Sequence, residues 1–170
     1  MDLRQFIRDV PNFPKEGILF FDITPLLAEP KAFRYAVDAM AERFQDLGAS
    51  KIVAAEARGF LFGAPLAYKM NLGFVPVRKP GKLPYKTTSV TYDLEYGTDT
   101  LSMHEDAVQP GDKVLIIDDL LATGGTAAAA ACLVTKMGGV LLEAQFLIEL
   151  EFLAGRRALS HLPVRTFLKF

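Results

Sequence analysis

The stretch that most constrains the fold is Val114–Thr126, which reads VLIIDDLLATGGT. Its first four residues are apolar and mostly β-branched, as in a strand buried on both faces of a parallel sheet. The acids Asp118 and Asp119 follow at once, and then the small residues Ala122–Thr126 form a turn. Ala127–Lys136 is rich in Ala and Leu and lacks Gly and Pro, which predicts a helix. The stretch therefore predicts a strand, an acidic pair, a glycine turn and a helix.

A glycine turn that opens a helix can bind an anion, because unpaired backbone N–H groups and the helix dipole converge there. Taken alone, such a turn fits tight packing between a strand and a helix equally well. The Walker pattern requires Lys where Thr126 stands, and the dinucleotide pattern G-x-G-x-x-G is absent. The acidic pair favours a binding site, because carboxylates accept hydrogen bonds from vicinal sugar hydroxyls. Asp118 and Asp119, together with Thr123, Thr126 and the loop amides, therefore predict a site for a ribose 5-phosphate.

The same order of strand, turn and helix occurs earlier, where Lys51–Ala55 is followed by a turn with Arg58 and by helical sequence from Phe60. Gly73–Val77 is a further strand. This alternation predicts an α/β fold, a mostly parallel central sheet flanked by helices. Ligands of such sheets bind at the carboxyl edge, where Arg58 lies, although an Arg in a turn is commonly a solvated charge. We expect the acidic pair to face solvent at the same edge.

The N-terminal segment predicts a short helix and then a strand. Phe6, Ile7 and Val10 have helical spacing, which the following prolines interrupt. Gly17–Pro25 is a short apolar run, typical of an edge strand that seals the core. An amphipathic helix begins at Pro30.

Two polar segments follow Gly73–Val77. Arg78, Lys79 and Lys82 form a cationic run, which is typical of a solvated loop but lies at the carboxyl end of a strand. Within the long segment 83–97, Thr87–Tyr92 can pair with Thr98–Met103 as an antiparallel flap, and segments of this length are often lids. Later sequence predicts strands over 140–150 and 164–170, and a short helix over 152–160.

Composition restricts the class of protein. A chain of 170 residues that is 51% hydrophobic and 23% charged predicts one domain, 1–170. A net charge of −1 argues against a nucleic-acid-binding surface, and no apolar run is long enough to span a membrane. The single Cys132 fits a reducing compartment, and His104 and His161 lack metal-ligand spacing. We expect a soluble cytoplasmic protein that binds neither nucleic acid nor membrane.

Five ordered segments resemble the type I phosphoribosyltransferases, which use 5-phosphoribosyl 1-pyrophosphate (PRPP). VLIIDDLLATGGT is similar to the PRPP motif of that family, and DDLLATGGT is most similar to its adenine-specific members. The other segments are NFPKEGILFFDITPLL, EARGFLFG, RKPGKLP and YDLEYG. The resemblance covers nearly the whole chain. It implies the type I phosphoribosyltransferase fold, with a small N-terminal hood (1–30) and a mobile flap (83–97).

The resemblance also implies an activity, the conversion of adenine and PRPP to AMP and pyrophosphate with Mg²⁺ on the diphosphate. Arg58 resembles part of the pyrophosphate loop, and Glu95 or Tyr96 of the flap resembles the residue that manages the purine proton. Asp118 and Asp119 are expected to hold the ribose hydroxyls and, indirectly, Mg²⁺. The remaining residues implied to bind PRPP or AMP are Ala122, Thr123, Gly124, Gly125, Thr126, Arg78, Lys79 and Lys82.

Leu19-Phe20-Phe21 matches the adenine hood of the family. Its first and third residues are implied to read the purine with backbone groups, while the middle aromatic ring stacks on the base. Phe21 stands where the family commonly has Arg, and it either turns inward against the apolar hood or thickens the pocket wall. The resemblance further implies a homodimer, in which RKPGKLP of one subunit completes the site of its neighbour.

Two other functions stay open. A phosphoribosyltransferase for hypoxanthine, guanine or xanthine would share the PRPP site and use another hood. A non-catalytic PRPP-responsive regulator would keep DDLLATGGT but needs a nucleic-acid-binding element. The chain shows neither a spare segment for a helix-turn-helix nor an excess of basic charge.

Overall fold

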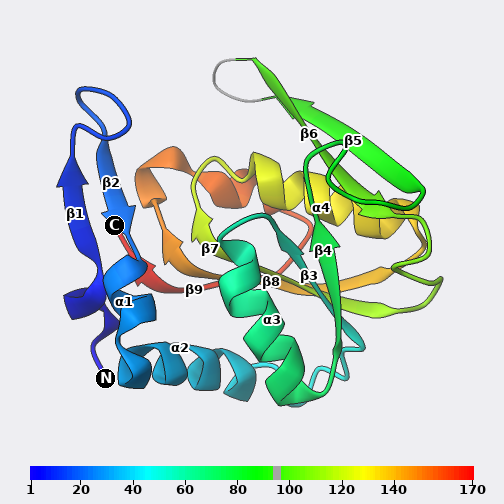
Figure 1. Ribbon diagram of the computed structural model, residues 1–170. Helices are drawn as coiled ribbons and strands as arrows, with labels where there is room; N and C mark the ends of the chain where they lie inside the picture. The colour runs from blue at the N-terminus through cyan, green and yellow to red at the C-terminus, as the bar shows by residue number, and fades with distance from the viewer. Residues whose placement is uncertain (94–96) are drawn as a thin grey trace.

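The computed structural model describes residues 1–93 and 97–170, and it has the predicted α/β architecture (Figure 1). A parallel sheet of five strands forms its centre, and two separate two-stranded antiparallel sheets accompany it. The strands are β1 (Arg8–Pro11), β2 (Leu19–Asp22), β3 (Lys51–Ala55), β4 (Gly73–Val77), β5 (Thr87–Asp93), β6 (Thr98–His104), β7 (Lys113–Leu121), β8 (Val140–Glu149) and β9 (Val164–Lys169).

The central sheet has the strand order β4-β3-β7-β8-β9, and each neighbouring pair is parallel. Val53 of β3 lies opposite Val75 of β4 on one side and Ile116 of β7 on the other. The middle strand β7 is apolar and buried from Val114 to Ile117, because helices cover both of its faces. The carboxyl ends of β3 and β7 therefore lie side by side.

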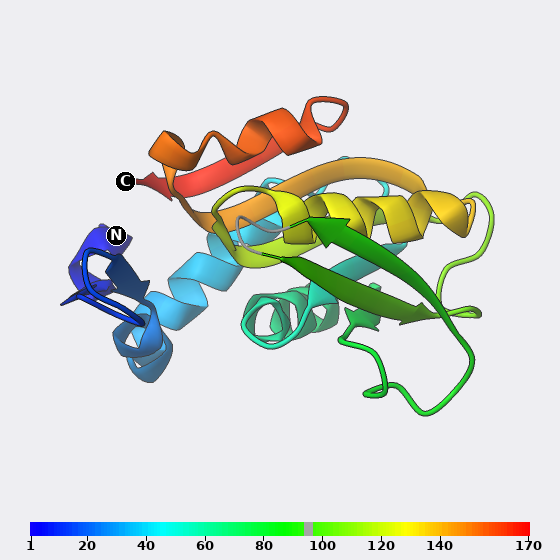
Figure 2. The ribbon, with the colours of Figure 1, turned by 90° about the horizontal axis from the view of Figure 1, so that it is seen from above.

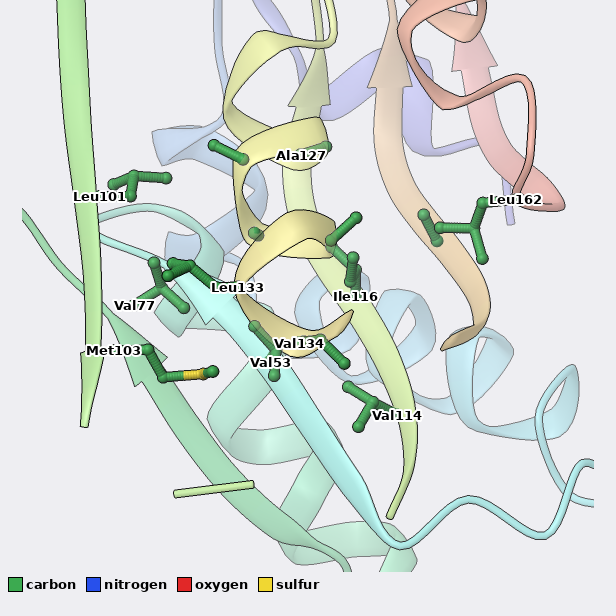
Figure 3. Close-up of a cluster of buried hydrophobic side chains, with 14 of the residues drawn as sticks. Val53, Val77, Leu101, Met103, Val114, Ile116, Ala127, Leu133, Val134 and Leu162 are labelled. Atoms are coloured by element: carbon green, nitrogen blue, oxygen red, sulfur yellow. The ribbon is translucent and has the colours of Figure 1, made fainter. Parts of the chain in front are cut away.

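Helices cover both faces of this sheet (Figure 2). Apolar side chains of α2 and α3 pack on one face, and α4 packs with the β5–β6 hairpin on the other, where Leu133 and Val134 contact the sheet core (Figure 3). The α-helices are α1 (Thr24–Ala28), α2 (Pro30–Glu42), α3 (Gly59–Met70) and α4 (Gly125–Lys136), and the 3-10 helices are η1 (Leu3–Phe6), η2 (Glu151–Leu153) and η3 (Gly155–Leu159). In the part of the chain that the structure describes, none of the helices combines the length and apolarity needed to cross a bilayer.

Three details differ from the sequence predictions. The N-terminal helix ends at Phe6, and Val10 belongs to a strand, because residues 8–11 pair with β2. That pairing also means that β2 joins a hairpin and does not seal an edge of the main sheet. Residues 151–159 form two 3-10 helices and not one short α-helix. The predicted antiparallel pairing of 87–92 with 98–103 is confirmed in β5 and β6, with Val90 opposite Leu101.

Candidate active site

A cavity of about 220 Å³ opens at the carboxyl edge of β3 and β7. Its wall is formed by the turn after β3, the end of β7, the glycine turn and the first turn of α4 as far as Ala127. The lining residues are Glu56, Ala57, Arg58, Asp118, Asp119, Leu120, Leu121, Ala122, Thr123, Gly124, Gly125, Thr126 and Ala127. The structure thus brings together Arg58, the acidic pair and the whole glycine turn.

The glycine turn owes its shape to Gly124, which has a φ of 85° and directly precedes α4. No side chain caps this helix through a hydrogen bond from the N-cap position. The first N–H groups of α4, on residues that line the cavity, are therefore not occupied by a capping side chain. A Cβ atom on Gly124 would collide with the backbone carbonyl oxygen of Gly155, and a Cβ on Gly155 would collide with that of Ala122. The turn and the start of η3 therefore pack backbone against backbone.

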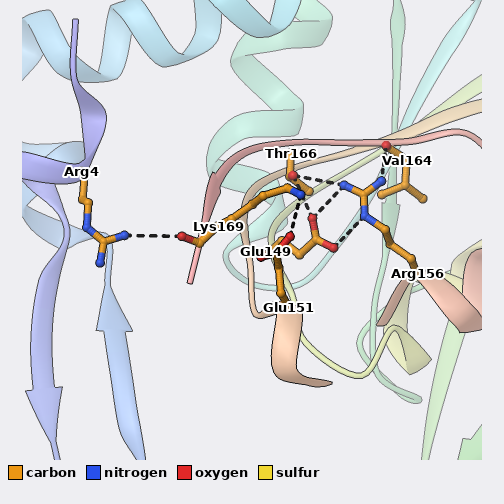
Figure 4. A network of polar contacts seen from close by, with 7 residues as sticks. All are labelled: Arg4, Glu149, Glu151, Arg156, Val164, Thr166 and Lys169. Carbon is orange, nitrogen blue, oxygen red and sulfur yellow. Dashed lines mark hydrogen bonds and ion pairs between the residues drawn. The ribbon is translucent and has the colours of Figure 1, made fainter. Parts of the chain in front are cut away.

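An ion pair fixes the segment behind the glycine turn (Figure 4). Arg156 of η3 donates from Nε and Nη2 to the carboxylate of the buried Glu149, both at 2.7 Å, and from Nη1 to the carbonyl oxygen of Val164 at 2.8 Å. The Arg156 guanidinium holds the pKa of Glu149 below its ordinary value. Since Arg156 adjoins Gly155, these bonds anchor the support of the turn to β8 and β9.

The acidic pair is less exposed than the sequence predicted. The strand β7 continues to Leu121, so both acids lie within it, and Asp119 is only 3% exposed. Arg58 Nε lies 3.0 Å from Asp119 Oδ2. Burial raises the pKa of Asp119 while Arg58 lowers it, and burial together with the charge of Asp119 raises the pKa of Asp118 well above its ordinary value. Hydrogen-bond donors or a cation on a ligand would stabilise the charged carboxylates.

Arg58 connects this cavity to the β1–β2 hairpin. Its guanidinium carbon lies 5.4 Å from the centre of the Phe20 ring. Phe20 also meets Phe13 edge-to-face at 5.1 Å, and these two rings line a second concavity of about 190 Å³ together with Val10 and Asp22. Arg58 therefore lies both in the wall of the first cavity and next to the aromatic surface formed by Phe13 and Phe20.

Comparison with known proteins identifies the family. A model of the phosphoribosyl transferase domain matches residues 22–149. The chain is 69% identical over 159 residues to the adenine phosphoribosyltransferase of Solidesulfovibrio magneticus, covering 94% of this chain and 93% of that protein. The chain belongs to the adenine phosphoribosyltransferases.

Solved structures of this phosphoribosyltransferase family share the fold. The adenine phosphoribosyltransferase of Thermoanaerobacter pseudethanolicus matches with a TM-score of 0.97 and 53% identity, covering 99% of this chain and 98% of that one. The enzyme of Saccharomyces cerevisiae, solved with adenine and an imino-altritol bisphosphate, matches with a TM-score of 0.93 and 45% identity, covering 98% and 96%. The type I phosphoribosyltransferase fold predicted from the sequence is thus confirmed.

The cationic segment of this phosphoribosyltransferase lies beside the cavity and outside its described wall. Arg78 donates from Nη2 to Glu56 Oε2 at 2.9 Å and from Nη1 to the carbonyl oxygen of Lys82 at 3.2 Å. Lys79 Nζ lies 3.0 Å from Asp99 Oδ2. Glu56, which the sequence reasoning did not single out, therefore joins this segment to the cavity, and its position directly after β3 was the available signal.

The structure places the three hood residues on β2 with alternating directions. Leu19 is about half exposed at 46%, and Phe20 faces Phe13 and Arg58. The Phe21 ring turns the other way and packs on Phe170, with ring centres 4.0 Å apart. Of the two arrangements considered for Phe21, the structure has the inward one.

One residue of the flap contacts the glycine turn. Tyr92 of β5 places its hydroxyl 3.2 Å from Thr126 Oγ1, so the flap reaches the glycine turn through a residue that the sequence reasoning did not assign. Glu95 and Tyr96 lie outside the described residues.

The carboxylates at the cavity fit a metal cation that is shared between the protein and a bound substrate. Asp118 and Asp119 supply hard carboxylate oxygens, and within residues 1–93 and 97–170 no three metal-binding side chains gather as a complete protein site. Mg²⁺ is commonly held by one or two carboxylates together with phosphate oxygens of a substrate. The site therefore suits a Mg²⁺ ion that arrives with a diphosphate.

Proposed function

We propose that the chain transfers the 5-phosphoribosyl group of PRPP to adenine, producing AMP and pyrophosphate. The observation that carries the proposal is the single cavity in which the glycine turn, the acidic pair and Arg58 meet, with the Phe20 surface next to Arg58. The relatives named adenine phosphoribosyltransferases support the choice of base. The cytoplasmic location stays a prediction.

The phosphate and the ribose are held by different parts of the cavity in this proposal. The N–H groups at the start of α4, with Thr123 and Thr126, bind the 5-phosphate, which takes no part in the reaction. Its binding energy serves to orient the sugar. Asp118 and Asp119 accept hydrogen bonds from the ribose hydroxyls and stabilise positive charge that develops on the ribose in the transition state.

The diphosphate leaves as negative charge develops on it, so cations stabilise the transition state. Arg58 is the cation among the described residues of the cavity wall, and the Asp119 carboxylate, 3.0 Å away, orients its guanidinium. Mg²⁺ bound near Asp118 and Asp119 would neutralise further charge on the diphosphate. Glu95 or Tyr96 is proposed to manage the purine proton.

Adenine is proposed to stack on Phe20 and to bind backbone groups of Leu19 and Phe21. Adenine presents a 6-amino donor and an N1 acceptor, and hypoxanthine reverses both. Each mismatched buried group costs about 1–3 kcal/mol, so we expect adenine to be preferred by more than about a hundredfold in kcat/KM.

We further propose a homodimer in which Arg78, Lys79 and Lys82 act on PRPP of the neighbouring subunit. Apolar side chains exposed on α2 and α3, Tyr35, Leu61 and Tyr68, support a contact with a second copy. Mixing an Asp119→Asn subunit with an Arg78→Ala subunit is expected to restore part of the activity. Full turnover by a monomer in light scattering would contradict this arrangement.

The test of the function is turnover of labelled adenine with PRPP and Mg²⁺, in competition with hypoxanthine and guanine. Formation of AMP and pyrophosphate in equal amounts is the expected result. Equal use of adenine and hypoxanthine would reject the adenine assignment and leave the PRPP site standing. Binding of PRPP without turnover of any purine would instead favour a regulator.

A further inference from the structure

Among the described residues, the hairpin that carries the adenine-facing residues forms no strand pairing with the main sheet. Within the described chain, β2 forms its strand pairing with β1, and the two strands make a separate sheet. An isolated two-stranded sheet is only marginally stable in water. The position of β2 beside Arg58 of the cavity therefore depends on the side chains that attach it to the rest of the fold.

One such attachment is an aromatic stack behind β2. The Phe21 ring packs on the ring of Phe170, with centres 4.0 Å apart and planes tilted by 48°. The guanidinium carbon of Arg4 in η1 lies 3.9 Å from the centre of the same Phe170 ring. Arg4 Nη1 also donates to the carbonyl oxygen of Lys169 at 3.5 Å (Figure 4), and the end of β9 lies beside β2 in Figure 1.

The Phe21–Phe170 stack affects the ligand-facing side of the hairpin because side chains along β2 point alternately to its two faces. Because neighbouring side chains point to opposite faces, holding Phe21 against Phe170 directs Phe20 toward Arg58. It also fixes the backbone N–H and C=O groups of residues 19–21. Displacement of the stack would thus shift the surface proposed to bind adenine, which consists of the Phe20 ring and the backbone of residues 19–21. The glycine turn would stay in place, because η3 supports it.

We propose that Phe170, with Arg4 behind it, is a positioning residue for adenine, an inference that rests on the proposed function. Phe170 touches no substrate in this role and acts through Phe21. Its replacement raises the KM for adenine, because the base surface is no longer held in the productive geometry. The KM for PRPP stays nearly constant, because the PRPP cavity is built from other elements.

The test compares Phe170→Ala with Phe167→Ala. Phe167 of β9 is the control, three residues before Phe170. Both rings are half-buried, and Phe167 is also covered by a guanidinium, because Arg43, which directly follows α2, lies 4.2 Å from its ring centre. We expect Phe170→Ala to raise the KM for adenine about tenfold and that for PRPP less than twofold. Phe167→Ala is expected to lower thermal stability without changing the ratio of the two KM values.

Further variants keep the test decisive if Phe170→Ala folds poorly. Phe170→Tyr retains the ring and is expected to restore the KM for adenine, while Phe170→Leu retains bulk without the ring and is expected to remain impaired. Arg4→Gln changes an exposed side chain and is expected to have a smaller effect of the same kind. Combining Phe21→Ala with Phe170→Ala is expected to cost little more than either change alone.

The outcomes separate the inference from the function on which it rests. A rise in both KM values by the same factor, or a loss of stability with an unchanged KM for adenine, overturns the positioning role while wild-type turnover stands. Additive effects of Phe21→Ala and Phe170→Ala overturn it as well. Absence of adenine turnover by the wild-type chain overturns the proposed function, and this inference with it.

Discussion

The two walls of the candidate site are built in opposite ways. The glycine turn lies between the middle strand of a buried five-stranded sheet and α4, and its backbone meets that of η3 at Gly124 and Gly155. The base-facing part of the hood is the β1–β2 hairpin, a separate two-stranded sheet whose side chains are half-buried or exposed. Backbone packing leaves almost no room for change, whereas side-chain packing can adjust. We therefore expect substitutions at the turn to affect PRPP strongly and those at the hood to affect the base more mildly.

The largest effect is expected from Gly155→Ala. The new Cβ would meet the carbonyl oxygen of Ala122, so the glycine turn must move. Displacement of a bound group by about 1 Å can cost about a hundredfold in rate, and we expect at least that loss in kcat/KM for PRPP. Gly73→Ala is the control, because its Cβ would meet the flexible Lys51 side chain at 3.3 Å. Equal, small losses in both variants would show that the turn is less constrained than its packing implies.

Next in size are Asp118→Asn and Asp119→Asn. Loss of a charge-assisted hydrogen bond costs about 1.5–3 kcal/mol, so kcat/KM for PRPP should fall at least about tenfold. Asp119→Asn also removes the buried partner of Arg58, so it should be the less stable of the two. Asp46→Asn, on the surface, is the control. Unchanged kinetics in both variants would exclude the acidic pair from the site.

A smaller effect is expected at the ion pair between Glu149 and Arg156, which supports the glycine turn, and it concerns the pH dependence of the free energy of unfolding. The pKa of Glu149 is lowered in the folded state by Arg156, so its carboxylate stabilises the fold above the unfolded pKa of about 4.3. That contribution is lost as pH falls through the lowered folded pKa. Glu149→Gln should therefore reduce the free energy of unfolding by about 1–3 kcal/mol at pH 7, measured by urea titration. The difference from wild type should shrink below about pH 4, and a constant difference would refute this origin.

The same contrast explains what could be predicted from the sequence. The strand, acids, turn and helix of 114–136 are consecutive, so local patterns identify them and their chemistry. Val10 has helical spacing but pairs with Phe20, a partner that local periodicity does not indicate. The contacts of Gly155 with the glycine turn and of Phe170 with Phe21 likewise join distant segments. Asp119 is buried because β7 continues to pair with β8 beyond the acidic pair. Two consecutive acidic residues in a sequence do not indicate such pairing.

The smallest effect is expected from Phe21→Arg, on the side of β2 that faces away from Arg58. A guanidinium can stack on the Phe170 ring as Arg4 does, although its charge is repelled by Arg4. The backbone groups of residue 21 are retained, so the preference for adenine over hypoxanthine should be unchanged.

Phe20→Ala, on the opposite side of the same strand, is the informative comparison for Phe21→Arg. It removes the proposed stacking on the base, which costs about 1–3 kcal/mol, and should lower kcat/KM for adenine accordingly. Competitive turnover of adenine and hypoxanthine by wild type and both variants measures the two effects together. A change in base preference in Phe21→Arg larger than the loss in Phe20→Ala would mean that side chain 21, and not its backbone, reads the base. In that case the two faces of β2 would have the reverse of the roles that their contacts with Arg58 and Phe170 indicate.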